Sequence, residues 1–207
     1  MNDRKPTAED FSLEALKARD RGEFARVVET YSGLIYRLAL KMLGNPQDAE
    51  DVLQETFLKA FRSLPNFDGR SSLSTWLYRI ATNEALMFLR RNKHLAISLD
   101  EPLENADQEE SEPLQIVDWC CLPENELMSA EALSHLDQAV EALSPALRVV
   151  FLLRDIEGLS TQETGEVLNL SEMAVKTRLS RARLRLREIL TEYYGERVLS
   201  RREVGGA

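Results

Sequence analysis

The sequence has few of the residues that build membrane spans, disulfide frameworks or turn-rich folds. The 207 residues include two cysteines, Cys120 and Cys121, which are adjacent and cannot form a disulfide framework. Nine glycines and seven prolines are few for this length, which favours helices. No uncharged apolar run approaches the roughly 18 residues of a membrane-spanning helix, and residues 1–10 are too polar for a signal peptide. We therefore expect a cytoplasmic, helical protein.

Motifs for catalysis and for metal binding are also missing. His94 and His135 are isolated from one another and have no metal-ligand spacing around them, and no glycine-rich phosphate loop is present. Carboxylates are abundant, but they lie in acidic stretches without a partnered base. We expect no metal, no cofactor and no enzymatic activity.

Positive charge is absent from the middle of the chain. The formal net charge of −9 argues against a nucleic-acid partner when it is taken whole. Residues 1–93 carry a net charge of +2, residues 94–147 carry −13 with no basic side chain, and residues 148–207 carry +2. This segregation predicts two folded parts on either side of an acidic, flexible linker, which we place at residues 96–126.

Apolar residues at helical spacing predict that the first part, residues 10–95, is all helical. Its predicted helices cover residues 11–43, 46–64 and 73–91. Gly44 is a helix stop, and Asn45-Pro46 combines a capping residue with a proline suited to the first helical turn. Turn-forming residues fill the loop between the second and third helices.

The second part, residues 127–194, is also predicted to be helical. Its expected helices cover residues 124–143, 145–157, 161–168 and 171–194. Gly158 ends the second of them, and Ser160 with Glu163 forms a capping box at the start of the third. The tight turn at residues 169–171 makes the last two helices a helix-turn-helix. The predicted fold class is therefore all-α, with two small helical domains joined by the linker.

The final helix has the charge pattern of a recognition helix. Residues 171–187 contain six basic side chains and one acidic side chain, Glu172. Such a helix can read base edges while its arginines and lysines hold phosphates. The alternative is a solvated basic helix that packs on an acidic partner, and the capping box, turn and apolar stripe together favour DNA binding.

Two surfaces of the first part also suggest binding. Asp48, Asp51, Glu55 and Leu58 follow one another at three- and four-residue steps, which places them on one helix face. This acidic face with an apolar residue is either a solvated face or a docking surface for a basic protein groove. On the next helix, Trp76 is interleaved with cations, as in proteins that stack single-stranded bases, although core packing explains a tryptophan equally well.

Three motifs resemble one protein family. Residues 48–61, DAEDVLQETFLKAF, resemble the core-polymerase-binding signature of bacterial RNA polymerase sigma factors. FDGRS at 67–71, followed by TWLYRIATN at 75–83, resembles the extracytoplasmic-function (ECF) group, sigma-E-like members included. Residues 143–160 and the helix-turn-helix resemble the C-terminal domain of that group.

The resemblance implies a promoter-recognition subunit without catalytic activity, and it implies three sets of contacts. Core RNA polymerase would be bound by Asp48, Asp51, Gln54, Glu55 and Leu58. The melted nontemplate strand at the minus-ten element would be bound by Phe67, Arg70, Ser71, Ser72, Trp76, Arg79, Asn83 and Arg90. The minus-thirty-five duplex would be bound by Ser171, Lys176, Thr177, Arg178, Ser180, Arg181 and Arg183. An anti-sigma factor is a further expected partner.

Two other classes of function remain open at the level of sequence. A stand-alone helix-turn-helix regulator would bind duplex DNA without polymerase. A protein-interaction module would show no dependence on DNA. Neither is expected to insert into a membrane.

Overall fold

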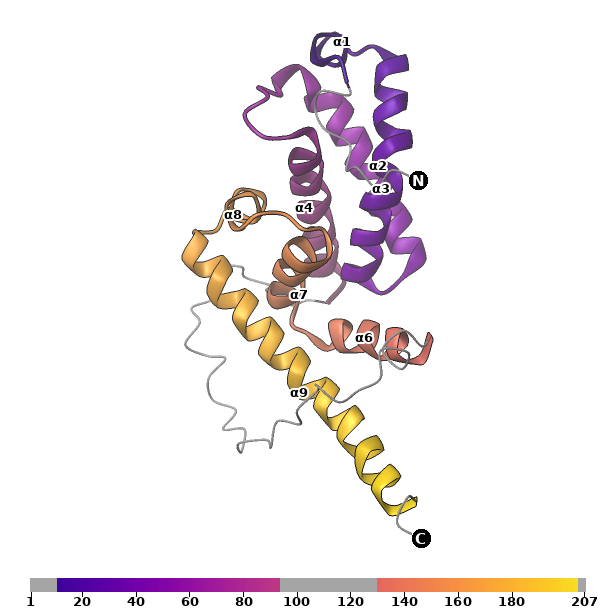
Figure 1. The fold of residues 1–207 in the computed structure, drawn as a ribbon. Helices are drawn as coiled ribbons and strands as arrows, with labels where there is room; N and C mark the ends of the chain where they lie inside the picture. Colours follow the sequence, from indigo (N-terminus) through magenta and orange to yellow (C-terminus); the bar gives the residue numbers. More distant parts are fainter. Residues whose placement is uncertain (1–10, 94–129, 205–207) are drawn as a thin grey trace.

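The computed structural model describes residues 11–93 and 130–204, and within those ranges the chain is helical with no strand (Figure 1). The elements of the N-terminal part are α1 (Leu13–Lys17), α2 (Arg21–Leu43), α3 (Pro46–Ser63), the 3₁₀ turn η2 (Leu64–Asn66) and α4 (Leu73–Lys93). The elements of the C-terminal part are α6 (Ala130–Ala142), α7 (Pro145–Phe151), the π-turn η5 (Leu152–Ile156), α8 (Thr161–Leu168) and α9 (Glu172–Val204). The all-α prediction is confirmed, and the linker lies outside the described residues.

The predicted boundary between α2 and α3 is confirmed in detail. Gly44 adopts a left-handed conformation, with φ of 72°, and its N–H donates to the Leu40 carbonyl. Asn45 Oδ1 accepts hydrogen bonds from the backbone N–H groups of Gln47 and Asp48, at 2.8 and 3.2 Å. Together these groups end one helix and start the next within two residues, so α2 and α3 form a tight hairpin.

The single helix predicted for residues 11–43 is wrong. The structure breaks it at Arg19, which has φ of 60°. Asp20 then caps α2 by accepting a hydrogen bond from the Glu23 N–H at 2.8 Å. The aspartate that looks like an ordinary helix residue in sequence is therefore an N-cap, and it lets the short α1 turn back over η2.

Helix α7 of the C-terminal part begins as predicted, with Ser144 at the N-cap and Pro145 in the first turn. The predicted helix to residue 157 instead widens into the π-turn η5, where the Glu157 N–H reaches back five residues to the Leu152 carbonyl at 2.8 Å. The last helix also runs past the predicted end at residue 194, to Val204.

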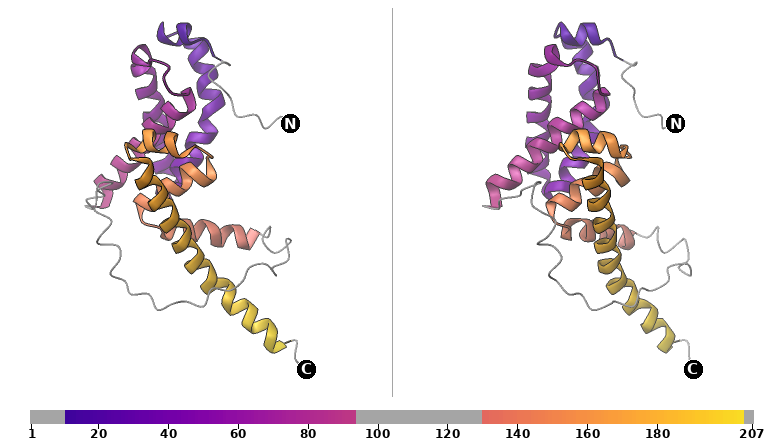
Figure 2. Two further views of the ribbon diagram at one scale, coloured as in Figure 1. Left: turned by 60° about the vertical axis from the view of Figure 1, so that its left-hand side comes forward. Right: turned by 90° about the vertical axis from the view of Figure 1, so that its left-hand side faces the viewer.

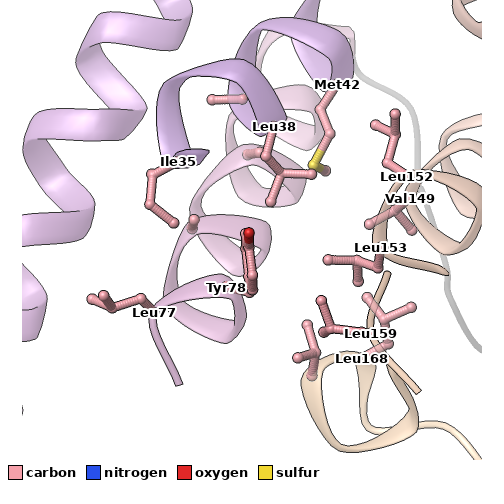
Figure 3. Packing of buried hydrophobic residues seen from close by; sticks show 14 of the residues in the cluster. Ile35, Leu38, Met42, Leu77, Tyr78, Val149, Leu152, Leu153, Leu159 and Leu168 are labelled. Carbon is pink, nitrogen blue, oxygen red and sulfur yellow. The ribbon is translucent and has the colours of Figure 1, made fainter. Parts of the chain in front are cut away.

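The two parts pack against each other around one continuous apolar core. Helices α2, α3 and α4 form a three-helix layer, and α7, α8 and α9 form the helix-turn-helix unit. Helices α6 and α7 contact α2. Helix α8 lies against α4, and Figures 1 and 2 show these two helices side by side. Figure 3 shows the meeting point, where Met42 and Tyr78 face Leu152, Leu153 and Leu159 across the boundary.

Candidate nucleic-acid interface

The outer face of α3 carries the side chains expected to bind polymerase. Ala49, Val52, Thr56 and Ala60 turn the opposite side of this helix into the core. Asp51 and Gln54 are consequently exposed, and Leu58 is 51% exposed, which is unusual for a large apolar side chain. The structure therefore brings the predicted residues together on one face, and Asp48 and Glu55 lie partly buried at its edges.

A lysine bridges this face to α4. The Lys59 ammonium lies 2.6 Å from a Glu84 oxygen and 3.6 Å from a Glu55 oxygen. Glu84 is the better buried partner, with a side chain that is 10% exposed. Lys59 thus offsets the charge of Glu55, whereas Asp51 is exposed on the same face and forms no ion pair within the described residues.

An apolar groove adjoins the same face. It lies between α2 and α3, and its volume is about 830 Å³. Its lining is Arg21, Phe24, Ala25, Val28, Glu29, Ser32, Leu53, Gln54, Phe57, Leu58 and Phe61. Leu58 is therefore both the apolar centre of the α3 face and a wall of this groove, which suits the docking of a helix with an apolar stripe.

Five of the eight residues expected to capture the melted strand line a second cleft of about 520 Å³, namely Phe67, Arg70, Ser71, Trp76 and Arg79. Phe67 and Trp76 both line it, with their ring centroids 4.9 Å apart. Phe67 is only 4% exposed, whereas Trp76 is partly buried and lines the cleft. The predicted stacking role therefore falls to Trp76 in this conformation, because Phe67 is covered.

The loop that leads into α4 is held by its own polar contacts. Asp68 accepts hydrogen bonds from the Arg70 backbone N–H at 3.1 Å and from the Arg70 guanidinium, and these bonds lower the pKa of the Asp68 carboxyl. The Ser72 hydroxyl accepts from the Thr75 N–H at 3.0 Å and so acts as the N-cap of α4. Arg70 remains largely exposed, with 89% of its side chain accessible.

The other expected strand contacts are distributed along α4. Arg79, Asn83 and Arg90 are exposed on this helix, and Ser71 is partly buried in the loop. Arg79 lines the cleft together with Trp76. Asn83 and Arg90 are not among the residues that line the cleft, so they extend the surface along the helix rather than close the pocket.

The helix-turn-helix forms at the predicted residues. The Ser160 hydroxyl accepts from the Glu163 N–H at 3.1 Å, and a Glu163 oxygen accepts from the Ser160 N–H at 2.7 Å. Asn169 makes the turn with φ of 55°, and Ser171 Oγ accepts from the Ala174 N–H at 3.2 Å to cap α9. Gly165 is required at the crossing, because a Cβ there would lie 2.7 Å from the Leu170 carbonyl oxygen.

The predicted duplex-reading residues divide into four groups, of which Arg183 alone is the last. Lys176 and Ser180 are exposed and Arg181 is partly exposed on the outer face of α9. The hydroxyls of Ser171 and Thr177 bond the backbone of their own helix. Arg178 is 6% exposed, so it packs inside the unit rather than facing outward.

Arg183 has a structural partner. It forms two hydrogen bonds to Asp155, at 2.7 and 2.8 Å, which fasten α9 to η5. The hydrogen bonds that the Arg183 guanidinium donates to this carboxylate raise the pKa of Arg183 above its ordinary value. A phosphate contact by Arg183 would have to share or break this bidentate pair.

Sequence reasoning missed the residues that join the two parts. The Tyr78 hydroxyl donates to a Glu157 oxygen at 2.5 Å, and the Thr75 hydroxyl donates to Glu163 at 3.3 Å. The Arg148 guanidinium donates to the Met42 carbonyl at 2.8 Å, across the same boundary. The sequence carries no local signal for these contacts, because the partners lie 79 to 106 positions apart along the chain.

Residues 11–93 and 130–204 contain neither a metal-binding cluster nor a membrane-spanning helix. In residues 11–93 and 130–204 no group of three or more histidine, cysteine, aspartate or glutamate side chains could hold a metal ion. None of the helices in those ranges is both long and apolar enough to cross a membrane. Cys120 and Cys121 lie outside the described residues.

Comparison with known families and proteins yields two matching families, in the order expected. Sigma-70 region 2 matches residues 27–95, and sigma-70 region 4 matches residues 134–186. The ECF RNA polymerase sigma factor SigW of Bacillus subtilis is 36% identical over 184 residues, which cover 87% of this chain and 95% of SigW.

Solved structures share the fold. The chain resembles CnrH, solved in complex with the cytosolic domain of CnrY, with a TM-score of 0.62 and 23% identity, over 87% of this chain and 95% of CnrH. It resembles the sigma factor RpoE of Bartonella quintana, solved with the anti-sigma factor NepR, with a TM-score of 0.60 and 23% identity, over 81% of this chain and 96% of RpoE. At this identity the likeness shows the fold alone.

Proposed function

Since this chain belongs to the ECF group of RNA polymerase sigma factors, we propose how its described surfaces divide the work of promoter recognition. A sigma factor binds core RNA polymerase and directs transcription initiation at particular promoters. Such proteins are initiation factors, and we assign no reaction to this chain. Its partners are core polymerase and promoter DNA, so we place it in the cytoplasm.

The observation that carries the proposal is the outer face of α3. Leu58 is 51% exposed beside the exposed Asp51 and Gln54, and it borders an apolar groove. An exposed leucine on an acidic face is suited to a protein partner that offers apolar side chains and positive charge. We assign this face, from Asp48 to Leu58, to core polymerase.

The cleft at the start of α4 is assigned to the melted nontemplate strand. Trp76 offers a ring on which a base can stack, and Arg70 and Arg79 offer charge for phosphates. Ser71, Ser72, Asn83 and Arg90 are assigned to the same strand on either side of the cleft. Phe67 acts from beneath, by supporting the Trp76 ring at 4.9 Å.

The outer face of α9 is assigned to the minus-thirty-five duplex. Lys176, Ser180 and Arg181 occupy the N-terminal half of this helix, which is the half that a helix-turn-helix inserts into the major groove. Thr177 and Ser171 lie beside them, Arg178 supports the helix from its packed side, and the exposed Arg183 fastens it to Asp155 of η5. We place the functional boundaries at residues 10–95, 96–126 and 127–194.

An anti-sigma factor is proposed as a further partner. The support is that the structurally similar RpoE was solved with one, the anti-sigma factor NepR. The groove beside Leu58 is a surface that such an inhibitor could share with polymerase. Inhibition would then follow from competition for one site.

Transcription in vitro tests the assignment. Purified chain is mixed with core polymerase and a promoter library, and transcripts are sequenced. Initiation at a small promoter set that depends on both components is expected. Duplex binding of equal strength with and without core polymerase would instead favour a stand-alone regulator, and no effect of DNA in any assay would favour a protein-interaction module.

A further inference from the structure

The first turn of α9 carries an apolar side chain that the packing of the chain does not use. Met173 is 72% exposed, more than any other large apolar residue of the described ranges. Val175 and Ala182, on the opposite side of α9, are fully buried. Single exposed apolar residues are common on protein surfaces, so the position of Met173 decides what it can do.

Met173 shares a side of α9 with residues assigned to the duplex. Steps of three, four and seven residues along the helix lead from it to Lys176, Thr177 and Ser180. In Figure 1 the start of α9 lies beyond α8, on the side of the molecule away from α2 and α3. A helix-turn-helix places the N-terminal residues of its second helix against base edges. A duplex bound in this way would cover Met173.

The other side chains of this turn already have contacts of their own. Ser171 Oγ accepts a hydrogen bond from the Ala174 N–H at 3.2 Å. A Glu172 oxygen lies 3.9 Å from the Lys176 ammonium. Ala174 is partly buried and ends at its methyl group. Met173 is therefore the side chain of this turn that can reach into a groove without disturbing a cap or an ion pair.

The residue that follows Met173 by one turn supports its backbone. The Thr177 hydroxyl donates to the Met173 carbonyl at 2.9 Å. A hydroxyl has one proton, so Thr177 keeps only acceptor capacity for a base in this conformation. The backbone of the first turn is held in place, and the exposed end of that turn is apolar.

The chemistry of methionine selects among the four bases. A thioether has no hydrogen-bond donor and is a weak acceptor, so Met173 cannot satisfy the polar edges of guanine, cytosine or adenine. Thymine differs because its C5-methyl group projects into the major groove. Contact between that methyl group and Met173 removes apolar surface of both from water.

We infer that Met173 is a specificity-determining residue, whose side chain contacts the C5-methyl group of one thymine in the minus-thirty-five element. This inference rests on the proposed function of α9. Phosphate contacts position a protein on the duplex, whereas base contacts carry sequence information. Arg181 accordingly supplies affinity, and Met173 supplies preference for thymine at one base pair.

The first test removes the methyl group from the DNA. Deoxyuridine pairs as thymidine does and lacks only the C5-methyl group. It replaces each thymidine of the minus-thirty-five element in turn, in a promoter obtained from the library transcription, with the minus-ten element unchanged. Holoenzyme assembled from core polymerase and the full chain should bind one of these duplexes about fourfold more weakly by fluorescence anisotropy, the ratio expected for one apolar carbon. Equal binding of all the duplexes overturns the inference.

The second test removes the side chain. Met173→Ala should bind the thymidine promoter about fourfold more weakly than wild type and should no longer distinguish it from the deoxyuridine duplex. Met173→Leu stays apolar and should keep a preference for thymidine, whereas Met173→Gln, of similar length but polar, should lose it. A ratio between the two duplexes that Met173→Ala leaves at the wild-type value overturns the inference.

The same helix offers a matched control. Leu184 is 53% exposed on α9, and it lies eleven residues beyond Met173, about 16 Å along the helix axis. Leu184→Ala removes a comparable apolar surface outside the N-terminal half of α9 and should keep the wild-type ratio. Met173→Ala should also unfold at the wild-type temperature, because its side chain is exposed. A lowered unfolding temperature, or the same loss of discrimination in Leu184→Ala, contradicts the inference.

Arg181→Ala separates the inference from the function on which it rests. If Arg181→Ala weakens promoter binding while every deoxyuridine duplex binds as the thymidine duplex does, α9 is the duplex-reading helix and the role of Met173 is overturned. If Arg181→Ala and Met173→Ala both bind the promoter as wild type does at every salt concentration, the proposed function of α9 itself fails.

Discussion

The hydroxyl of Tyr78 lies 2.5 Å from a carboxylate oxygen of Glu157, 79 positions further along the chain. Burial raises the pKa of the Tyr78 phenol, and the hydrogen bond to Glu157 raises it further, while Arg37 acts weakly in the opposite direction. The phenol must keep its proton to donate to a carboxylate. The contact between the two parts of the chain therefore depends on a group that titrates in alkaline solution.

This pair predicts a pH dependence of stability. In the unfolded chain Tyr78 loses its proton near the ordinary value of about 10, whereas the raised pKa keeps it protonated in the folded state. The stabilisation is then fully present below pH 10 and declines as the pH rises toward the folded-state pKa. Urea unfolding from pH 8 to pH 11 should show Tyr78→Phe less stable than wild type by about 1–2 kcal/mol at pH 8. That difference should shrink above pH 10, and a constant difference across the range would contradict the assignment.

The exposed acidic face of α3 predicts which substitutions weaken the binding of core polymerase. Asp51→Arg reverses the charge at its exposed edge, and we expect at least tenfold weaker association with core polymerase, about 1.4 kcal/mol. Leu58→Ala removes an exposed apolar anchor and should cost about 1–2 kcal/mol of binding. Surface plasmon resonance with immobilised core polymerase measures both.

Charge reversal elsewhere supplies the control for that experiment. Glu14 is exposed on α1, so Glu14→Arg changes the net charge as Asp51→Arg does but leaves the α3 face intact. Equal losses for the two variants would indicate a general electrostatic effect and would remove the basis for a docking face.

The recognition face of α9 predicts a salt-dependent effect. Arg181→Ala should weaken binding of holoenzyme to promoter duplex by about 1–3 kcal/mol and lower the slope of log affinity against log salt by about 1. Arg185 pairs with Glu188 further along α9, at 3.1 Å, so Arg185→Ala is the matched control. Fluorescence anisotropy at several salt concentrations gives both quantities. Promoter binding by Arg181→Ala that equals wild type at every salt concentration would exclude this face.

Two glycines give opposite predictions for the same substitution. In Gly165→Ala the new Cβ would lie 2.7 Å from the Leu170 backbone oxygen, so the helix-turn-helix must shift and duplex binding should be lost. In Gly33→Ala, within α2, the nearest atom is the end of the Arg37 side chain at 3.6 Å. Alanine should then stabilise the helix by about 0.5–1 kcal/mol. Thermal unfolding measures both, and a stabilised Gly165→Ala would refute the close crossing of α8 and α9.

Local signals predicted the individual helices well. The capping asparagine, the glycine stops and the capping box act over four residues or fewer, so their chemistry is readable in sequence. Asp20 was missed because an aspartate inside an apolar periodicity gives no sign that the preceding Arg19 turns left-handed. The π-turn was missed for a related reason, since its wider hydrogen bond leaves the residue types unchanged.

The candidate site was only partly predictable. Spacing placed Asp51, Gln54 and Leu58 on one face, because helix geometry alone decides this. Helical spacing did not predict that Phe67 and Arg178 would be buried. The burial of Phe67 depends on its contact with Trp76, and the burial of Arg178 depends on the packed side of α9. The contact between Tyr78 and Glu157 joins segments that are far apart in sequence, and no local pattern encodes such a pair.

Arg148 has a consequence for how these chains can vary. Its guanidinium donates to the carbonyls of Met42, at 2.8 Å, of Leu143, at 3.1 Å, and of Glu141. One side chain thereby joins the end of α2 to the end of α6, and the angle between the two parts is set by these carbonyls. All three partners are backbone oxygens, so the contact depends on the residue type at position 148 and not on the residue types at positions 42, 141 and 143.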